Sequence, residues 1–371
     1  MEFTLYGYTF AAEPEWIALG AAFVIGALMF YWARKSRRSY LFLPELSVVA
    51  DPAEPLPIAT IIPARNEAHQ IARAVSSFPH NPVIVVDDAS TDGTAEVAAR
   101  AGATIVSAPK LRRGMAGKPN ACQAGANSTD AEWLLFVDAD TWYEPPFAPS
   151  LLAYAREHSL SMTTVFLKQE CVTIWEKMLL PYAFGLYFCG VDARQVNDPL
   201  GFEALANGQC MLWKHANYDF AGGHRAVGQS VIEDVELARV AKRHQLKTMV
   251  LRGEQFGHVR MYDSFAAIWR GFQKNSFRFL LVNPRTGFEV VLASIVMASW
   301  IPVLVALCWQ GLWVPALLFY FIPSLAWAPW YGGFFRALLV PYAIYLFQAI
   351  ALNAMVSTTF GLETRWKGRR I

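Results

Sequence analysis

Residues 134–142 read LLFVDADTW, an apolar run that ends in two aspartates one residue apart. An apolar run of this length predicts a fully buried β-strand. The alternation of a strand would place Asp138 and Asp140 on one side at the carboxyl end, with Ala139 facing the other way. Two neighbouring carboxylates repel each other unless a cation lies between them, and hard divalent cations prefer oxygen ligands. The alternative is that Asp140 only begins a turn, since Asp is a common turn residue.

Strand and helix patterns alternate before this run. The strand-like segments are IATII (58–62), which ends at Pro63, PVIVV (82–86) and ATIVS (103–107). Between them lie three helical patterns: IARAVSSF (71–78), a segment that opens near Thr91, and KPNACQAGANS (118–128). This alternation implies βαβ units and a mainly parallel sheet, in which ligands bind at the carboxyl ends of the strands. Acidic side chains that follow separate strands are therefore expected along one edge.

The composition adds a membrane part to this domain. The chain has 371 residues, 54% of them hydrophobic, and a net charge of +2 that by itself says nothing about partners. No charged residue or His occurs in three ranges: 16–33, 290–335 and 337–362. About 20 apolar residues span a bilayer, so all three ranges predict transmembrane helices. The five cysteines show no paired spacing and need not form disulfides in a reducing compartment.

Basic clusters predict the topology. The first apolar range is followed by RKSRR (34–38), and positive charge stays on the cytoplasmic side. We therefore expect a multi-pass protein of the cell membrane with its soluble domain in the cytoplasm. The basic sequence TRWKGRR (364–370) favours two C-terminal crossings, near 290–309 and 337–358, with 311–330 re-entrant or interfacial. A third crossing is the alternative.

Two further segments are apolar without predicting a span. Residues 172–190 are interrupted by Pro181 and are too apolar for a soluble surface, whereas residues 264–282 mix aromatic and basic residues as interfacial helices do. The predicted organisation follows: an N-terminal transmembrane helix and basic flank (1–38), a linker (39–56), a catalytic domain (57–262), an interfacial amphipathic helix (263–286), a C-terminal transmembrane region (287–362) and a basic tail (363–371).

Five motifs occur in the order and approximate spacing of one family. They are IIPARNE, VVDDASTDGT, GKPNACQAGA, FVDAD and IEDVELARVAK, and together they cover about residues 56–285. The chain resembles family 2 glycosyltransferases, in the membrane-bound branch of carotenoid-type and other lipid glycosyltransferases, with ceramide glucosyltransferase more distant. The resemblance implies an α/β GT-A fold, Rossmann-like with a mainly parallel sheet, between N-terminal and C-terminal transmembrane helices.

The resemblance also implies roles for particular residues. The loop Ala64, Arg65, Asn66 and Glu67 would line the base and ribose of a UDP-sugar, and Asp88, with Asp87 beside it, would bind the uracil. Asp140 would bind Mg²⁺ or Mn²⁺, with Asp138 on the ribose or the metal's water shell, and Asp234 resembles the catalytic base. The remaining candidates are Lys118 for the donor phosphates, and Gln209, Glu233, Trp269 and Arg270 for the acceptor and diphosphate region.

The chemistry suits these residue types. A departing diphosphate accumulates negative charge, which a divalent cation stabilises, and the acceptor hydroxyl must lose a proton to a carboxylate. A single displacement of this kind inverts the anomeric centre. Structural explanations compete with these roles, since acids such as Asp234 near a helix start are favoured by the helix dipole alone. Lys118 has the alternative of a surface lysine, and His224 is either an extra metal ligand or only a loop residue. Cys122, Cys189 and Cys210 are expected to be packing residues.

One departure and several alternatives remain. The Q-x-x-R-W motif of processive members is replaced by FAAIWRGFQKN (265–275), with Trp269 and Arg270 in reverse order, which argues against a polysaccharide synthase. The expected partners are a nucleotide-sugar donor, a lipid acceptor and the membrane, with no nucleic acid. The alternatives are transfer to a non-lipid acceptor, a related nucleotidyltransferase, and a catalytically inactive nucleotide-binding membrane scaffold.

Overall fold

The computed structural model describes residues 2–5, 8–11, 13–49, 55–111, 115–201, 203–230, 232–282, 284–360, 365–366 and 369–370. The chain divides into two compact units. The sheet unit comprises Phe42–Cys171, Asp192–Asp263 and Gly361–Ile371, and the helical unit comprises Met1–Leu41, Val172–Val191 and Ser264–Phe360.

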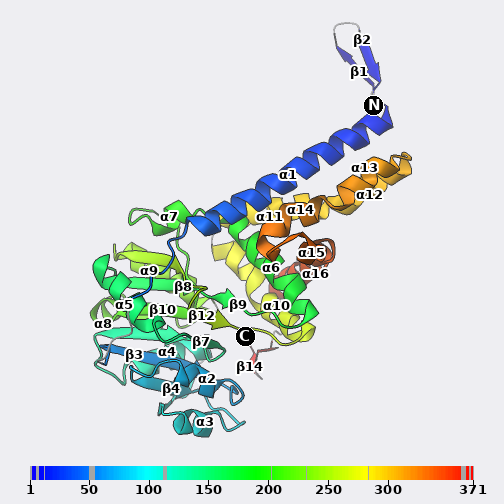
Figure 1. The fold of residues 1–371 in the computed structure, drawn as a ribbon. Coiled ribbons are helices and arrows are strands. Elements are labelled where there is room, and N and C mark those ends of the chain that lie inside the picture. The colour runs from blue at the N-terminus through cyan, green and yellow to red at the C-terminus, as the bar shows by residue number, and fades with distance from the viewer. Residues whose placement is uncertain are drawn as a thin grey trace. The chain divides into compact units, whose positions relative to one another are not determined.

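A seven-stranded sheet forms the centre of the sheet unit (Figure 1). All strands run parallel except β10, which pairs antiparallel with both of its neighbours. The predicted mainly parallel α/β sheet is therefore confirmed. In spatial order the strands are β11 (Thr248–Arg252), β8 (Met162–Phe166), β10 (Cys210–Lys214), β6 (Trp133–Val137), β3 (Ile58–Ala64), β4 (Val83–Asp87) and β5 (Thr104–Ser107).

Two element boundaries differ from the sequence prediction. Strand β3 continues past Pro63 to Ala64, because its pairing with β6 stops at Ile61 and a proline is tolerated where one neighbouring strand is missing. The helix that follows β4, α3, begins at Thr94 instead of near Thr91. The carboxylate of Asp92 accepts the backbone N–H of Thr94 at 3.1 Å, which holds the preceding residues in a turn.

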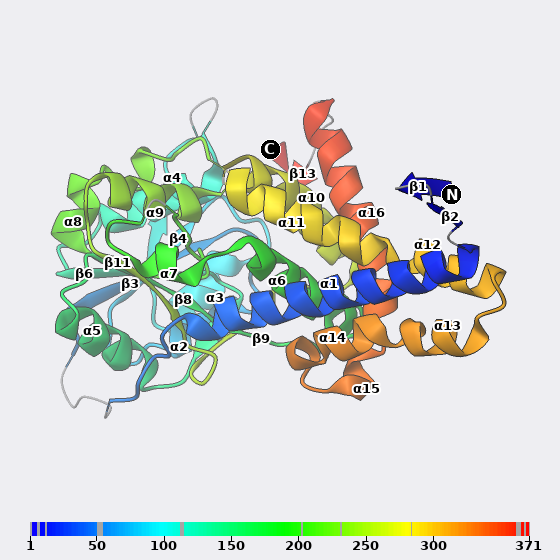
Figure 2. The same cartoon turned by 90° about the horizontal axis from the view of Figure 1, so that it is seen from above.

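Helices cover both faces of this sheet (Figures 1 and 2). One face carries α2 (Ile71–Ser76), α3 (Thr94–Arg100) and α5 (Phe147–Glu157), and the other carries α4 (Gly117–Ala126), α8 (His215–Phe220) and α9 (Glu233–Arg243). Because both faces are covered, the strands are apolar throughout, as β6 illustrates with five buried residues in succession. The short helix α7 (Ala193–Asn197) lies near β11.

A small second sheet follows the end of β6. It contains β7 (Thr141–Tyr143), β12 (Gly257–Val259) and β9 (Lys168–Gln169), with β12 in the centre. The rings of Trp142 and His258 stack across the β7–β12 pair, with centroids 5.4 Å apart. This sheet anchors the chain directly after the two aspartates of the opening motif.

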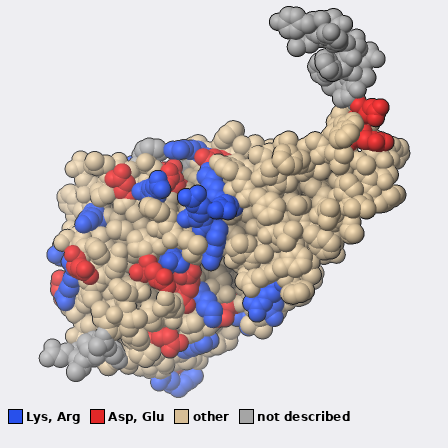
Figure 3. Space-filling view, turned by 45° about the horizontal axis from the view of Figure 1, so that its top comes forward, with Lys and Arg blue, Asp and Glu red and all other residues tan. Residues whose placement is uncertain are grey.

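The helical unit contains the predicted apolar helices. Within the described ranges, three helical stretches are long and apolar enough to cross a membrane: α1 (Pro14–Phe42), the run Pro284–Trp309, and α16 (Val340–Thr359). The second stretch consists of α11 (Pro284–Ala298) and α12 (Trp300–Trp309). Residues 313–337, predicted in part to be re-entrant or interfacial, form α13 (Trp313–Tyr320), α14 (Ile322–Tyr331) and α15 (Phe334–Ala337). On the face in Figure 3, a broad area of this unit carries no charged side chains.

Two more helices complete this unit. Residues 172–190 form α6 (Ile174–Gly190), which begins with a capping box between Thr173 and Glu176 and contains Pro181, and α10 (Phe265–Val282) covers the predicted interfacial segment. A close contact joins α6 to α14, because a Cβ added at Gly185 would lie 2.1 Å from the Trp327 ring. An ion pair between Lys35 and Glu289 joins α1 to α11. The hairpins β1–β2 (Glu2–Leu5, Tyr8–Ala11) and β13–β14 (Arg365–Trp366, Arg369–Arg370) lie near the chain ends.

Candidate active site

The two aspartates of the opening motif lie in a turn beyond the end of β6. Strand β6 ends at Val137, and the carbonyl oxygen of Asp138 accepts both the hydroxyl of Thr141 at 2.7 Å and its backbone N–H at 3.3 Å. Strand alternation therefore does not orient Asp138 and Asp140, and that part of the prediction is wrong. Their position at the carboxyl end of the strand is confirmed, and it places them at the ligand-binding edge of the sheet.

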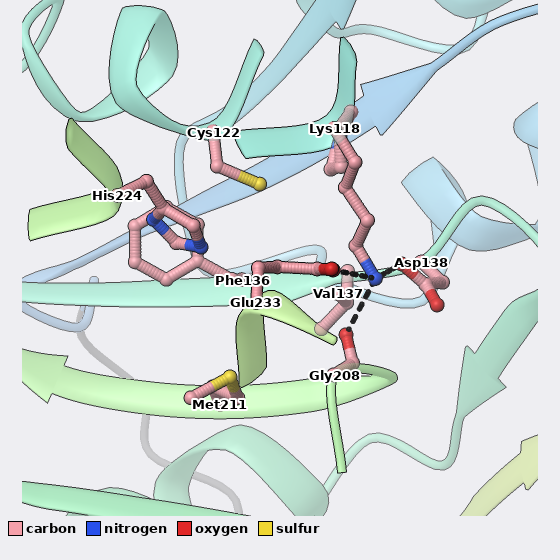
Figure 4. Close-up of a pocket in the computed structure, with 10 residues that line it drawn as sticks. Lys118, Cys122, Phe136, Val137, Asp138, Gly208, Met211, His224 and Glu233 are labelled. Carbon is pink, nitrogen blue, oxygen red and sulfur yellow. Dashed lines mark hydrogen bonds and ion pairs between the residues drawn. The ribbon is translucent and has the colours of Figure 1, made fainter. Parts of the chain in front are cut away.

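Lys118 brings together the acidic residues of this edge (Figure 4). Its Nζ lies 2.6 Å from Oδ1 of Asp138 and 3.3 Å from Oε1 of Glu233, and it donates to the carbonyl oxygen of Gly208 at 3.2 Å. Burial alone would lower the pKa of Lys118, but the carboxylates of Asp138 and Glu233 outweigh it and raise that pKa well above its usual value. Lys118 is thus a permanent cation among carboxylates at the start of α4.

Asp234 is oriented by the backbone of a neighbouring loop. Its Oδ2 accepts the N–H of Gly208 at 2.8 Å, and its Oδ1 accepts the N–H of Val235 at 2.9 Å. Burial, the charge of Glu233 and the opposing effect of Lys118 together raise the pKa of Asp234 to about 6. A carboxylate with this pKa is ionised at neutral pH and can still accept a proton.

The loop that carries Gly208 is also hydrogen-bonded to the turn of Asp138 and to the strand that follows this turn. The carbonyl oxygen of Gln209 accepts the N–H of Asp138 at 3.3 Å and the hydroxyl of Tyr143 at 3.0 Å. The side chain of Gln209 accepts a hydrogen bond from Asn207 at 3.0 Å. Gln209, predicted for the acceptor region, therefore supports the turn of Asp138 through its backbone, while its side chain belongs to the same loop.

The predicted nucleotide loops form one hydrogen-bonded unit. Arg65 donates through Nη1 to the carbonyl oxygen of Asp88 at 2.5 Å, and the N–H of Glu67 donates to the hydroxyl of Thr94 at 2.8 Å. Asp87 ends β4, and its carboxylate accepts the N–H of Ser90. The segment from Ala64 to Glu67 thus lies against residues 87–94 at the carboxyl ends of β3 and β4, as predicted.

A small cavity adjoins Lys118. Its lining comprises Pro63, Lys118, Cys122, Phe136, Val137, Asp138, Gly208, Met211, His224 and Glu233. His224 lies in a short 3₁₀ helix (Gly223–Arg225) and is buried, with its Nδ1 2.8 Å from the hydroxyl of Tyr218. Burial and the nearby charge of Lys118 lower the pKa of His224 to about 3, so the ring is neutral. The sequence predicted that His224 is either a metal ligand or only a loop residue. The residues next to His224 in the chain did not indicate that its side chain is buried against Phe136.

Other predicted residues lie outside this group. Trp269 and Arg270 belong to α10 in the helical unit. The cysteines Cys122, Cys189 and Cys210 are buried, as expected of packing residues. Among the residues that the structure describes, no three His, Cys, Asp or Glu side chains are grouped to hold a metal ion. Asp138 and Asp140 remain the candidate ligands at this edge.

The fold is similar to that of a solved structure. Across 95% of this chain and 100% of the other, it is similar to the mannosyltransferase PcManGT from Pyrobaculum calidifontis, determined in complex with GDP-Man and Mn²⁺, with a TM-score of 0.57 and 16% identity. The sheet unit has a GT-A fold. Residues 59–226 match glycosyl transferase family 2.

Curated relatives resemble the chain over the same region. It is 27% identical over 227 residues to 4,4'-diaponeurosporenoate glycosyltransferase of Staphylococcus haemolyticus (strain JCSC1435). It is 28% identical over 227 residues to the protein of the same name from Staphylococcus aureus (strain USA300). In both cases the match covers 59% of this chain and 60% of the relative.

Proposed function

We propose that this protein is a membrane-bound, inverting glycosyltransferase. It transfers a sugar from a nucleotide-sugar, most simply a UDP-sugar, to a lipid or another membrane-embedded acceptor. The single observation that carries the proposal is the environment of Asp234. This carboxylate has a raised pKa and accepts a hydrogen bond from the backbone of Gly208. It lies at the carboxyl edge of the sheet, near the ion pairs of Lys118 with Asp138 and Glu233. The match of residues 59–226 to glycosyl transferase family 2 supports the same reading.

Asp234 acts as the general base in this proposal. The acceptor oxygen attacks the anomeric carbon, its proton passes to Asp234, and the bond between the anomeric carbon and the diphosphate oxygen breaks. The diphosphate leaves with the electron pair. Because there is one displacement, the configuration at the anomeric carbon inverts. The ammonium of Lys118 keeps positive charge at the edge where the departing diphosphate is expected.

The donor set at the end of β6 fits a divalent cation. Asp138 and Asp140 offer hard carboxylate oxygens, and Mg²⁺ uses one or two carboxylates together with substrate phosphates. When bound, Mg²⁺ or Mn²⁺ would neutralise charge that develops on the diphosphate. The same-fold mannosyltransferase was determined with Mn²⁺, which supports this choice. The loops at Arg65 and Asp88 would hold the nucleotide.

The acceptor is proposed to be a lipid. The described residues of the helical unit include three stretches that can cross a membrane, and the curated relatives are named 4,4'-diaponeurosporenoate glycosyltransferase. We propose that the sheet unit faces the cytoplasm, because the basic cluster RKSRR directly follows the apolar part of α1. The donor would then come from the cytoplasm and the acceptor from the inner leaflet.

The test uses the full chain in nanodiscs made from lipid extract of the host organism. UDP-sugars and GDP-sugars are added with Mn²⁺ or Mg²⁺, and sugar incorporation into organic-extractable material is measured. Asp140→Ala and Asp234→Asn should each abolish incorporation, whereas Asp219→Asn, a change at an exposed carboxylate of α8, should not. Nucleotide release without labelled lipid would indicate a non-lipid acceptor. Nucleotide binding without turnover would support an inactive scaffold.

A further inference from the structure

We propose that His224 binds one hydroxyl group of the donor sugar, in the cavity that it shares with Lys118 and Glu233. This inference rests on the proposed function and deepens it by naming a residue that selects the sugar. It concerns the interior of the sheet unit alone and uses neither the metal nor the acceptor.

The burial of His224 leaves one polar atom to be explained. Its side chain is 2% exposed and packs against the ring of Phe136, with centroids 4.8 Å apart. Nδ1 is bonded to the hydroxyl of Tyr218, which also accepts the backbone N–H of His224 at 3.0 Å. Within the described part of the chain, Nε2 has no hydrogen-bond partner, although His224 lines the cavity. Nε2 is not among the fully enclosed polar atoms that lack a partner, so it is open to the cavity, where a ligand group can bond it.

The contacts of Tyr218 bear on the tautomer of the imidazole ring. The hydroxyl of Tyr218 lies 2.8 Å from Nδ1 of His224 and donates to Oε1 of Gln123 at 3.3 Å. An amide oxygen has two lone pairs, so Oε1 of Gln123 also accepts the backbone N–H of Arg225 at 3.1 Å. Because the hydroxyl proton points to Gln123, we assign the ring proton to Nδ1, which leaves Nε2 as an acceptor. A neutral ring that accepts through Nε2 suits an uncharged donor such as a hydroxyl group.

The cavity limits the size and charge of the ligand group. Its volume of about 10 Å³ is the space of about one water molecule, and a hydroxyl group is of similar size. Phosphate and acetamido groups are larger than this space. The ammonium of Lys118 disfavours a metal ion on that side, and the wall of Phe136, Met211 and Cys122 suits the carbon atoms that bear a hydroxyl.

The experiment compares binding of bare nucleotides and nucleotide-sugars to the full chain in nanodiscs by calorimetry. The probes are UDP, GDP, UDP-glucose, UDP-galactose and GDP-mannose, followed by monodeoxy analogues of the tightest-binding sugar. The wild type should bind one deoxy analogue about tenfold more weakly, as expected for one neutral hydrogen bond. His224→Phe should bind the parent sugar about tenfold more weakly, lose nothing further with that analogue, and bind the bare nucleotide normally.

Two variants separate this role from a structural one. His224→Gln keeps a side-chain amide that can accept or donate a hydrogen bond, and it should restore part of the preference for the hydroxyl. His244→Phe makes the same chemical change at an exposed histidine at the end of α9 and should behave as wild type. The inference is overturned if His224→Phe discriminates among the deoxy analogues as the wild type does, or if it weakens bare nucleotide and nucleotide-sugar equally. A folded wild type that binds no nucleotide at all would overturn the proposed function as well.

Discussion

The backbone N–H of Gly208 donates a 2.8 Å hydrogen bond to Oδ2 of Asp234, across 26 positions of sequence. The loop that holds the candidate base also contributes its carbonyl oxygen to Lys118, at 3.2 Å. One glycine therefore links the proposed base to the cation that neutralises Asp138 and Glu233. The positions of base and cation depend on each other, because both are fixed by the same peptide segment.

Gly208→Ala is expected to reduce turnover about tenfold or more while leaving the fold intact. An added Cβ would lie 3.1 Å from Nζ of Lys118 and 3.2 Å from Cβ of Asp234, so both side chains must shift by a few tenths of an ångström. Sugar incorporation and the apparent Tm of the nanodisc sample measure the two effects. Gly20→Ala, where an added Cβ meets nothing within 4 Å, is the matched control. Full activity in Gly208→Ala would contradict the proposed positioning.

Asp234 should set the acid limb of the pH–rate profile. Its pKa is about 6, so the base is ionised and active above this value, and kcat/KM should fall as the pH drops through 6. The profile is measured with a saturating metal concentration from pH 5 to 8. A rate that stays constant across this range would show that another group limits the reaction.

The same pKa predicts an effect on stability with a definite sign. The folded-state pKa of Asp234 lies above the unfolded value of about 3.9, so its protonated form favours folding below pH 4, and this contribution is lost as the pH rises through 6. At pH 7.5 the ionised carboxylate therefore costs stability. Asp234→Asn does not titrate, but its single amide oxygen can accept only one of the two backbone N–H groups, so this variant serves as the non-titrating reference. The Tm of the wild type relative to this variant should rise as the pH falls from 7.5 through 6, and a difference that stays constant would refute this account.

Removal of the Lys118 cation should destabilise the sheet unit. Lys118→Met leaves Asp138 and Glu233 without their shared partner, and we expect a loss of about 1–2 kcal/mol, less than for a fully buried pair because the side chain is 34% exposed. Glu233→Gln in the Lys118→Met background should recover part of this loss. Denaturant unfolding of both single variants and the double variant gives the coupling. Additive effects would show that the two residues do not interact.

Gly185 should be required for packing within the helical unit. Gly185→Ala would place a Cβ 2.1 Å from the buried ring of Trp327, and overpacking of this kind costs about 1–3 kcal/mol. Thermal unfolding in nanodiscs should show a lower Tm. Gly26→Ala, whose added Cβ would make ordinary contacts at 3.6 Å, should be close to neutral. Equal effects of the two substitutions would contradict a specific contact at Gly185.

The sequence by itself determined the architecture of both units. The alternating apolar segments predicted a mainly parallel sheet, and the charge-free ranges predicted the long apolar helices α1 and α16. It also predicted that Asp87, Asp88 and Asp138 lie at strand ends, because the end of an apolar run is a local property of the chain. The spacing of apolar residues along a single segment indicates whether that segment forms a strand or a helix. This is why these predictions were confirmed.

Only the tertiary structure decided which side chains meet. Lys118 contacts Glu233 across more than a hundred residues, and His224 is buried against Phe136 by the packing of separate elements. The aspartates of the opening motif lie in a turn because the carbonyl oxygen of Asp138 accepts hydrogen bonds from Thr141, which strand alternation could not predict. Hydrogen bonds and ion pairs between distant segments depend on how the elements pack, and no local pattern of residues encodes that packing.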